Sequence, residues 1–201
     1  MNELQINPAK TVLILIDLQH AILSRETAPH TAAQVVENSK KLAEIFRAKG
    51  ATVVYVRVDI NDFLELPVDE SSPMGPGPFP AILSEIAPSA GFQTGDTLIV
   101  KRHWGAFAGT DLDEQLKSRG VDTIVLAGIS TNHGVESTLR QGTGLGYAYI
   151  TVEDACSGMD AEQHRFAVTN IFPRLSRVRS TSEVLAALGH PPSVASHLPK
   201  C

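Results

Sequence analysis

Three features are scarce in this chain of 201 residues: cysteine, long apolar runs and an excess of positive charge. Only Cys156 and Cys201 are present, too few for a disulfide framework, so a reducing, cytoplasmic compartment is expected. The longest apolar run, Val12 to Ile16, is far too short to span a bilayer. The formal net charge of −5 supplies no basic surface for phosphates. Neither a membrane nor a nucleic acid is therefore expected as a partner.

The composition is that of a folded chain. Hydrophobic residues make up 43% and charged residues 19%, which predicts one domain over residues 1–201. The region 59–95 contains the stretch SSPMGPGPFP (71–80), which is too rich in proline and glycine for a plain connection. Loops of this length are typical of lids and binding surfaces, so a lid or interface loop is predicted there. Residues 190–201 are expected to form a tail.

Short apolar segments alternate along the chain with segments of helical periodicity. Strands are predicted at 11–16, 51–58, 97–100, 123–127, 147–152 and 178–179. Helices are predicted at 31–49, 111–119, 135–144, 161–171 and 182–188. This alternation indicates βαβ units, and hence an α/β fold with a doubly wound, mainly parallel sheet of about six strands and helices on both faces.

Three chemically useful features stand where predicted strands end: Asp17, Lys101 and the turn GISTNHG (128–134). Open parallel sheets bind ligands at the carboxyl ends of their strands. A partly desolvated acid has a raised pKa and suits proton transfer, and a neighbouring lysine can orient it or stabilise negative charge. The turn offers N–H groups and a helix N-terminus to an oxyanion. Taken singly, Asp17 could also be a cap and Lys101 a solvated cation.

Four segments carry a family resemblance: LILIDLQ (13–19), IVKRHWGAF (99–107), VLAGISTNHGVESTLRQGTGLGY (125–147), and EDACSG with EQH (153–164). Together they resemble the isochorismatase-like hydrolases, also called the cysteine hydrolase superfamily, which includes nicotinamidases, N-carbamoylsarcosine amidohydrolases and isochorismatases. Amidases of that family use an aspartate, a lysine and a cysteine. The resemblance places these at Asp17, Lys101 and Gly134 of this chain.

Glycine at position 134 has no side chain to attack a carbonyl, so the covalent thioester route of the amidases cannot start there. Isochorismatases also carry glycine at this position and cleave a vinyl ether without a covalent intermediate. The resemblance thus implies that Asp17 protonates the enol-ether carbon while Lys101 holds the substrate or tunes the acid. The glutamine and arginine ligands of isochorismatases have no counterpart at 58–63. An amidase that uses activated water, and a catalytically silent member that binds a metabolite or a protein, therefore stay open.

The resemblance also implies residues around the reaction centre. The family has a non-proline cis peptide in this turn, whose register here is Ile129–Ser130, and His133 is placed to reach a ligand. Trp104 and Phe107 are expected either to wall an apolar substrate pocket or to pack against a second subunit. Family members usually form dimers or larger symmetric assemblies, so a homo-oligomer, a dimer or a tetramer, is expected around a small-molecule substrate.

Neither a metal nor another cofactor is expected. Zinc-containing nicotinamidases of the family use an Asp-x-His…His cluster after the second strand, whereas residues 59–62 here read DIND without histidine. Cys156, expected just past the fifth strand, is interpreted as structural because no base flanks it. Glu153 and Asp154 are expected to end that strand, and His164 to serve a helix start or a subunit contact.

Overall fold

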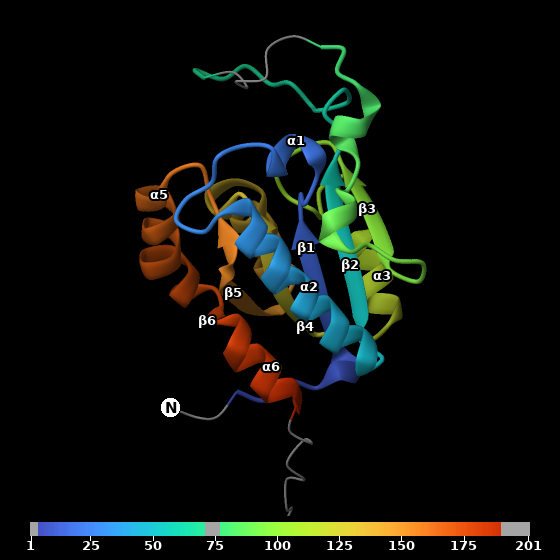
Figure 1. Cartoon of the computed structure of the whole chain (residues 1–201). Helices are drawn as coiled ribbons and strands as arrows, with labels where there is room; N and C mark the ends of the chain where they lie inside the picture. The colour runs from blue at the N-terminus through green and yellow to red at the C-terminus, as the bar shows by residue number, and fades with distance from the viewer. Residues whose placement is uncertain (1–3, 71–76, 190–201) are drawn as a thin grey trace, which may run out of the picture.

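A six-stranded parallel sheet forms the centre of the computed structural model, which describes residues 4–70 and 77–189 (Figure 1). The strands are β1 (Thr11–Ile16), β2 (Thr52–Val58), β3 (Thr97–Lys101), β4 (Thr123–Ile129), β5 (Ala148–Ser157) and β6 (Arg177–Arg179). Their order across the sheet is β3-β2-β1-β4-β5-β6. The predicted class, a doubly wound parallel sheet of six strands, is confirmed.

The central strand β1 is apolar from Val12 to Ile16 because layers cover both of its faces. All six of its residues are buried, as expected for a strand inside a parallel sheet. It pairs with β2 on one side and β4 on the other, which sets Ile16 opposite both Val56 and Gly128. The end of β1 therefore lies in the middle of the molecule.

Helices cover both faces of the sheet. The long helix α2 (Ala32–Ala48) begins with a capping box between Thr31 and Gln34 and packs on the front face in Figure 1, beside α6 (Thr181–Gly189). Helix α3 (Leu112–Ser118) lies behind the sheet. The connections β4–β5 and β5–β6 advance across the sheet in the direction opposite to the β1–β2 connection. Because such crossovers are right-handed, their helices lie on the other face. Helices α4 (Glu136–Gly144) and α5 (Ala161–Phe166) are therefore on the face away from α2.

Strand β5 is longer than the sequence predicts. The register between β4 and β5 shifts after Leu126, and pairing resumes with Gly128 opposite Cys156 and Ile129 opposite Ser157. The predicted strand end at residue 152 was therefore wrong, and so was the placement of Cys156 past the strand. The polar pair that suggested a strand end lies at the shift in register.

Both polar residues at this shift have partners, which explains why the strand tolerates them. Asp154 accepts hydrogen bonds from the N–H and the hydroxyl of Thr181 at 2.6 and 2.8 Å, so it caps α6 from inside a strand. Glu153 binds two histidines that are described below. A polar side chain does not end a strand when the neighbouring elements supply its hydrogen bonds.

The segment between β2 and β3 is partly regular where the structure describes it. It contains two 3-10 turns, Ala81–Ser84 and Pro88–Ala90, and Ile86 forms an isolated bridge with Gln19. A short helix that the sequence did not predict, α1 (His20–Leu23), follows β1 and contacts the first of these turns. The predicted tail 190–201, with Cys201, lies outside the described residues. None of the described helices has the length and apolarity needed to cross a membrane.

The sheet reverses its winding between β1 and β4, and such a switch point is where open α/β sheets bind ligands. The two strands approach closely there because β4 carries a glycine with φ of +127°. A Cβ atom on Gly128 would lie 2.2 Å from the Ile16 carbonyl oxygen. The fold thus brings the end of β1 directly against the turn that follows β4.

Candidate active site

Asp17 and Lys101 form a buried ion pair at the switch point. Asp17 follows β1 with a left-handed φ of 54°, a conformation that aspartate tolerates better than most residues. Lys101 ends β3, two strands away, and its Nζ donates to Asp17 Oδ2 at 2.7 Å. Only 1% of the Lys101 side chain and 10% of the Asp17 side chain are exposed. The solvated lysine and the capping aspartate that the sequence left open are thereby excluded.

The two oxygens of the Asp17 carboxyl group differ in their surroundings. Oδ2 accepts the hydrogen bond from Lys101, whereas Oδ1 is buried with no hydrogen-bond partner among the described residues. Burial raises the pKa of Asp17 above its ordinary value, and the Lys101 charge and hydrogen bond only partly oppose it. The group can therefore hold a proton at a higher pH than an exposed aspartate.

Gly134 lies against this pair. A Cβ atom built on Gly134 would be 2.9 Å from Asp17 Oδ2, 2.9 Å from Ile16 Cγ2 and 3.0 Å from Lys101 Nζ. The position that the resemblance assigns to a nucleophile is thus in contact with the acid and the lysine. The side chains of Asp17, Ile16 and Lys101 therefore leave little space for a Cβ atom at position 134.

The turn that carries Gly134 is a π-helical turn, Thr131–Val135, which leads into α4. The peptide Ile129–Ser130 before it is cis, as the family resemblance implies. The N–H groups of His133 and Val135 both donate to the Ser130 carbonyl, at 3.1 and 3.2 Å. These two N–H groups are therefore engaged within the turn. They are not free to donate to the oxyanion that the sequence predicts at this turn.

An aromatic cluster stands beside the ion pair. The Trp104 carbonyl accepts a second hydrogen bond from Lys101 Nζ at 2.7 Å, which fixes the loop after β3 to the pair. Trp104 is 44% exposed, and its ring lies 5.0 Å, centroid to centroid, from the ring of His133. Phe63 contacts Trp104 edge-on and stacks on His103, both at 5.3 Å. The structure therefore brings Trp104 and His133 together beside the acid–lysine pair.

Phe107 lies in a different environment from Trp104. Its side chain is buried in the core, its ring stacks on Tyr147 at 5.8 Å, and its N–H donates to Gln141 Oε1. These contacts give Phe107 a packing role beneath the loop. Of the two pocket-wall candidates, only Trp104 joins the aromatic cluster.

Partial burial lowers the pKa of His133. The negative charge of Glu136 opposes this shift, and the positive charge of Arg25 adds to it. The imidazole is therefore neutral near pH 7 and can accept or donate one hydrogen bond. Its ring is suited to stacking on a planar part of a ligand beside Trp104.

Two polar residues that hold the site together were not singled out from the sequence. Gln19 is fully buried, and its side-chain amide bonds both backbone groups of Val58 and the Ser84 carbonyl at 2.8–2.9 Å. The Thr138 hydroxyl donates to the Gly134 carbonyl at 2.7 Å and accepts from the Ala106 N–H. They tie the end of β1 to β2, and the turn to the loop after Lys101. Such a role depends on contacts between residues far apart in the sequence, so an isolated polar residue in the sequence does not indicate it.

A second polar network lies behind the turn. Glu153 Oε1 is 2.9 Å from His30 Nε2 and 3.2 Å from His164 Nε2, and His164 Nδ1 is 2.8 Å from the Thr131 hydroxyl. The two histidines lower the pKa of Glu153 to about 2, so the group is ionised. His164 is only 2% exposed, which excludes the subunit contact, one of the two roles that the sequence left open; the residue lies in the short helix α5. The three donor atoms lie within 4.8 Å of one another, a spacing that a metal ion can bridge.

Cys156 is fully buried in β5, and burial raises the pKa of its thiol. A buried, protonated thiol is a poor nucleophile. The burial and the raised thiol pKa agree with the prediction that Cys156 has a structural role.

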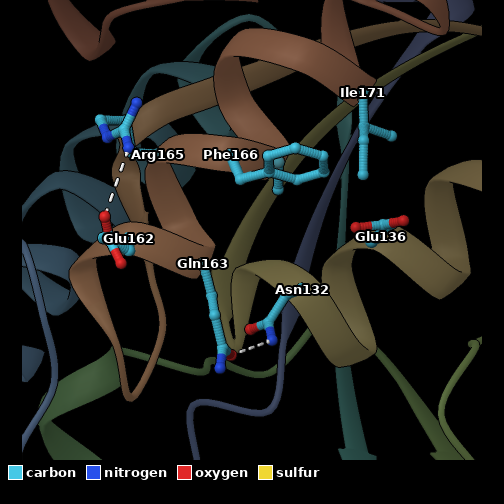
Figure 2. A pocket seen from close by; sticks show the side chains of 8 residues that line it. Asn132, Glu136, Glu162, Gln163, Arg165, Phe166 and Ile171 are labelled. Carbon is cyan, nitrogen blue, oxygen red and sulfur yellow. Dashed lines mark hydrogen bonds and ion pairs between the residues drawn. The ribbon is translucent and has the colours of Figure 1, made fainter.

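A hollow of about 430 Å³ lies between the turn and α5 (Figure 2). Figure 2 shows Asn132 and Gln163 pointing toward one another across it, joined by a hydrogen bond of 2.7 Å, with Phe166 and Glu136 along its walls. Asp17, Lys101 and Gly134 do not line this hollow. It is therefore separate from the acid–lysine pair.

Comparison with known proteins decides the family. Residues 11–183 match the family profile described as the Isochorismatase domain. This chain belongs to the isochorismatase family. It is a hydrolase, and its six-stranded sheet is the fold of that family.

Relatives within the isochorismatase family match over most of their length. The isochorismatase family protein YecD of Escherichia coli O157:H7 is 48% identical, over 92% of this chain and all of that protein. The ureidoacrylate amidohydrolase RutB of Acinetobacter baylyi is 28% identical, over 93% of this chain and 87% of that protein. A solved isochorismatase family structure from Burkholderia thailandensis superposes with a TM-score of 0.87 at 38% identity, covering 94% of this chain and 100% of that one.

Proposed function

We propose that this isochorismatase-family hydrolase cleaves a vinyl ether of a small metabolite, using Asp17 as a general acid and no covalent intermediate at position 134. The supporting observation is the asymmetric carboxyl group of Asp17. One oxygen is held by Lys101, and the other is buried, has no partner among the described residues, and belongs to an acid whose pKa is raised. Residue 134 beside it has no side chain that could attack the substrate.

The chemistry then runs in two steps. Asp17 Oδ1 gives its proton to the terminal carbon of the C=C–O unit, which forms a C–H bond and leaves an oxocarbenium ion. Water adds to the cationic carbon and returns a proton to Asp17, and the resulting hemiketal collapses to a ketone and an alcohol. For isochorismate, the products are pyruvate and a dihydroxylated cyclohexadiene carboxylate. One water is consumed, and Asp17 ends protonated as it began.

Lys101 has the geometry to hold an anionic substrate while it orients the acid. A lysine ammonium has three donors, and two of them are used by Asp17 Oδ2 and the Trp104 carbonyl. The third is available for a substrate carboxylate. A charge-assisted bond of this kind inside a dry site fixes the C=C–O unit against Asp17.

Trp104 and His133 supply the surface for the cyclic part of the substrate. Their rings lie 5.0 Å apart and are tilted by 34°. The Trp104 carbonyl accepts a hydrogen bond from Lys101, which places this ring pair beside the lysine. An aromatic face favours a flat, unsaturated ring over a long flexible chain. The proposed substrate class is therefore a small, planar, carboxylated enol ether.

The ureidoacrylate amidohydrolase relatives favour a second candidate, an amidase. That reaction needs a nucleophile, and with glycine at position 134 it would have to be an activated water. Asp17 would then have to act first as a base, whereas burial favours its protonated form. The vinyl-ether reaction uses the acid in the form that its surroundings support.

The test is pyruvate release from isochorismate by the purified chain and by the isosteric variant Asp17→Asn. Wild type should release pyruvate, and the variant should lose at least about 100-fold in kcat, the usual contribution of a positioned general acid. In water labelled with ¹⁸O, the alcohol product should carry no label, because water adds to the vinyl carbon and the ring C–O bond stays intact.

Other outcomes would contradict specific parts of this proposal. Full activity of Asp17→Asn would remove Asp17 as the acid, and label in the alcohol would mean that the other C–O bond breaks. Wild type that hydrolyses ureidoacrylate but not isochorismate would favour the amidase. If wild type hydrolyses neither compound, the proposed substrate class is wrong.

A further inference from the structure

We propose that His30, Glu153 and His164 form a binding site for a zinc ion or a chemically similar first-row divalent cation, behind the turn that carries Gly134. The donors come from three separate elements: the loop before α2, strand β5 and helix α5. None of the three residues takes part in the proposed vinyl-ether chemistry. Two imidazoles and one carboxylate are a donor set typical of zinc.

The distances fit shared coordination. His30 Nε2 and His164 Nε2 lie 2.9 and 3.2 Å from Glu153 Oε1. Neighbouring ligands on an ion with bonds of roughly 2.0–2.2 Å are separated by about 2.9–3.6 Å. Two of the three donor–donor distances fall in this range, and all three atoms lie within 4.8 Å of one another. Glu153 supplies the carboxylate oxygen of the set, and the two histidines supply ring nitrogens.

Both histidines are held by contacts outside the cluster, which supports a metal site. His164 Nδ1 is 2.8 Å from the Thr131 hydroxyl, so the hydrogen bond sets the ring orientation and leaves Nε2 facing the other donors. The His30 carbonyl accepts from the hydroxyls of Ser157 and Thr27 at 2.7 and 2.8 Å. The His164 ring and the His30 backbone are therefore positioned before an ion binds.

One side of the cluster faces solvent. The His164 side chain is 3% exposed, whereas those of His30 and Glu153 are 26% and 34% exposed. A cation can enter from that side, and water can complete its coordination. Through His164 and Thr131, the bound ion would stiffen the π-helical turn Thr131–Val135. This role is independent of which substrate the active site takes.

The experiment is a Co²⁺ titration of the full chain, freed of metal and of any affinity tag and followed by visible absorption. Wild type should bind one Co²⁺ per chain with a d–d spectrum that one equivalent of Zn²⁺ displaces, and Zn²⁺ should raise the Tm. His30→Gln and Glu153→Gln should each weaken binding by about tenfold or more. His20→Gln removes a histidine outside the cluster and should leave the titration unchanged.

Two results would overturn the site. The absence of saturable binding in wild type would mean that the three residues form only a hydrogen-bonded network. Equal affinity in wild type, His30→Gln and Glu153→Gln would place the ion elsewhere. Circular dichroism of each variant verifies the fold, and His30→Gln, at a partly exposed loop residue, keeps the test decisive if the strand variant is unstable. The readout is binding, so it does not depend on activity toward isochorismate.

Discussion

Removing Lys101 should make the stability of this protein depend steeply on pH, because it isolates a buried carboxyl group. In wild type, Asp17 Oδ2 is bonded to Lys101 and Oδ1 has no partner among the described residues. In Lys101→Met, the apolar stem is largely kept, but Oδ2 loses its hydrogen bond, so neither oxygen then has a partner among the described residues. Removing one member of a buried ion pair costs about 3–5 kcal/mol of unfolding free energy at neutral pH.

The pH dependence follows from the raised pKa of Asp17. An unfolded aspartate titrates near about 3.9, so below that pH both states carry the proton and burial costs nothing extra. As the pH rises above it, the unfolded chain releases the proton while the folded chain keeps it. Stability then falls by about 1.4 kcal/mol per pH unit until the folded-state pKa is reached. Lys101→Met should therefore be less stable at pH 7 than at pH 5, because the Lys101 charge that opposes the raised pKa is gone.

The assay is urea denaturation of Lys101→Met at pH 5, 6 and 7, with Lys101→Met/Asp17→Asn as the matched control. The control has no titrating group at position 17, so every other pH effect cancels in the difference between the two variants. A difference that stays flat from pH 5 to pH 7 would refute the reasoning. Asp17 would then be hydrated or otherwise stabilised as an anion, and its part as proton donor would fail with it.

Two glycine substitutions test how tightly the switch point is packed. Gly134→Cys places its Cβ about 3 Å from Asp17, Lys101 and Ile16, so urea denaturation should show a loss of about 1–3 kcal/mol and no ureidoacrylate hydrolysis should appear; amidase activity would show that the pair moves aside. Gly128→Ala combines φ of +127° with a Cβ 2.2 Å from the Ile16 carbonyl and should cost more than about 3 kcal/mol. The control Gly144→Ala, with open space in a helix, should be neutral or stabilising, and equal stability of the two alanine variants would contradict the packing argument.

The sequence by itself determined the sheet and the residues at its strand ends. Buried parallel strands are nearly continuous apolar runs such as Val12–Ile16, and their boundaries with helices are set by local signals. Five of the six strands could therefore be predicted within two residues, whereas the end of β5 was missed. Because parallel strands end at the same edge, Asp17, Lys101 and the turn with Gly134 could be placed together before any contact was known.

Only the tertiary structure decided the electrostatics of those residues. Whether Lys101 is solvated or 1% exposed depends on the layers that close over it, and no local pattern reports that. The same holds for Phe107, which packs on Tyr147 although it stands three residues after Trp104 in the same loop.

The network of His30, Glu153 and His164 could not be found from sequence for a related reason. Glu153 is separated from His30 by 123 residues and from His164 by 11, and it lies where the register between β4 and β5 shifts. Propensity and periodicity act over a few residues, whereas the position of a buried polar side chain is set by partners that folding brings from distant elements. The sequence therefore determined where chemistry can occur, and the packing decided which groups are protonated, paired or ready to bind an ion.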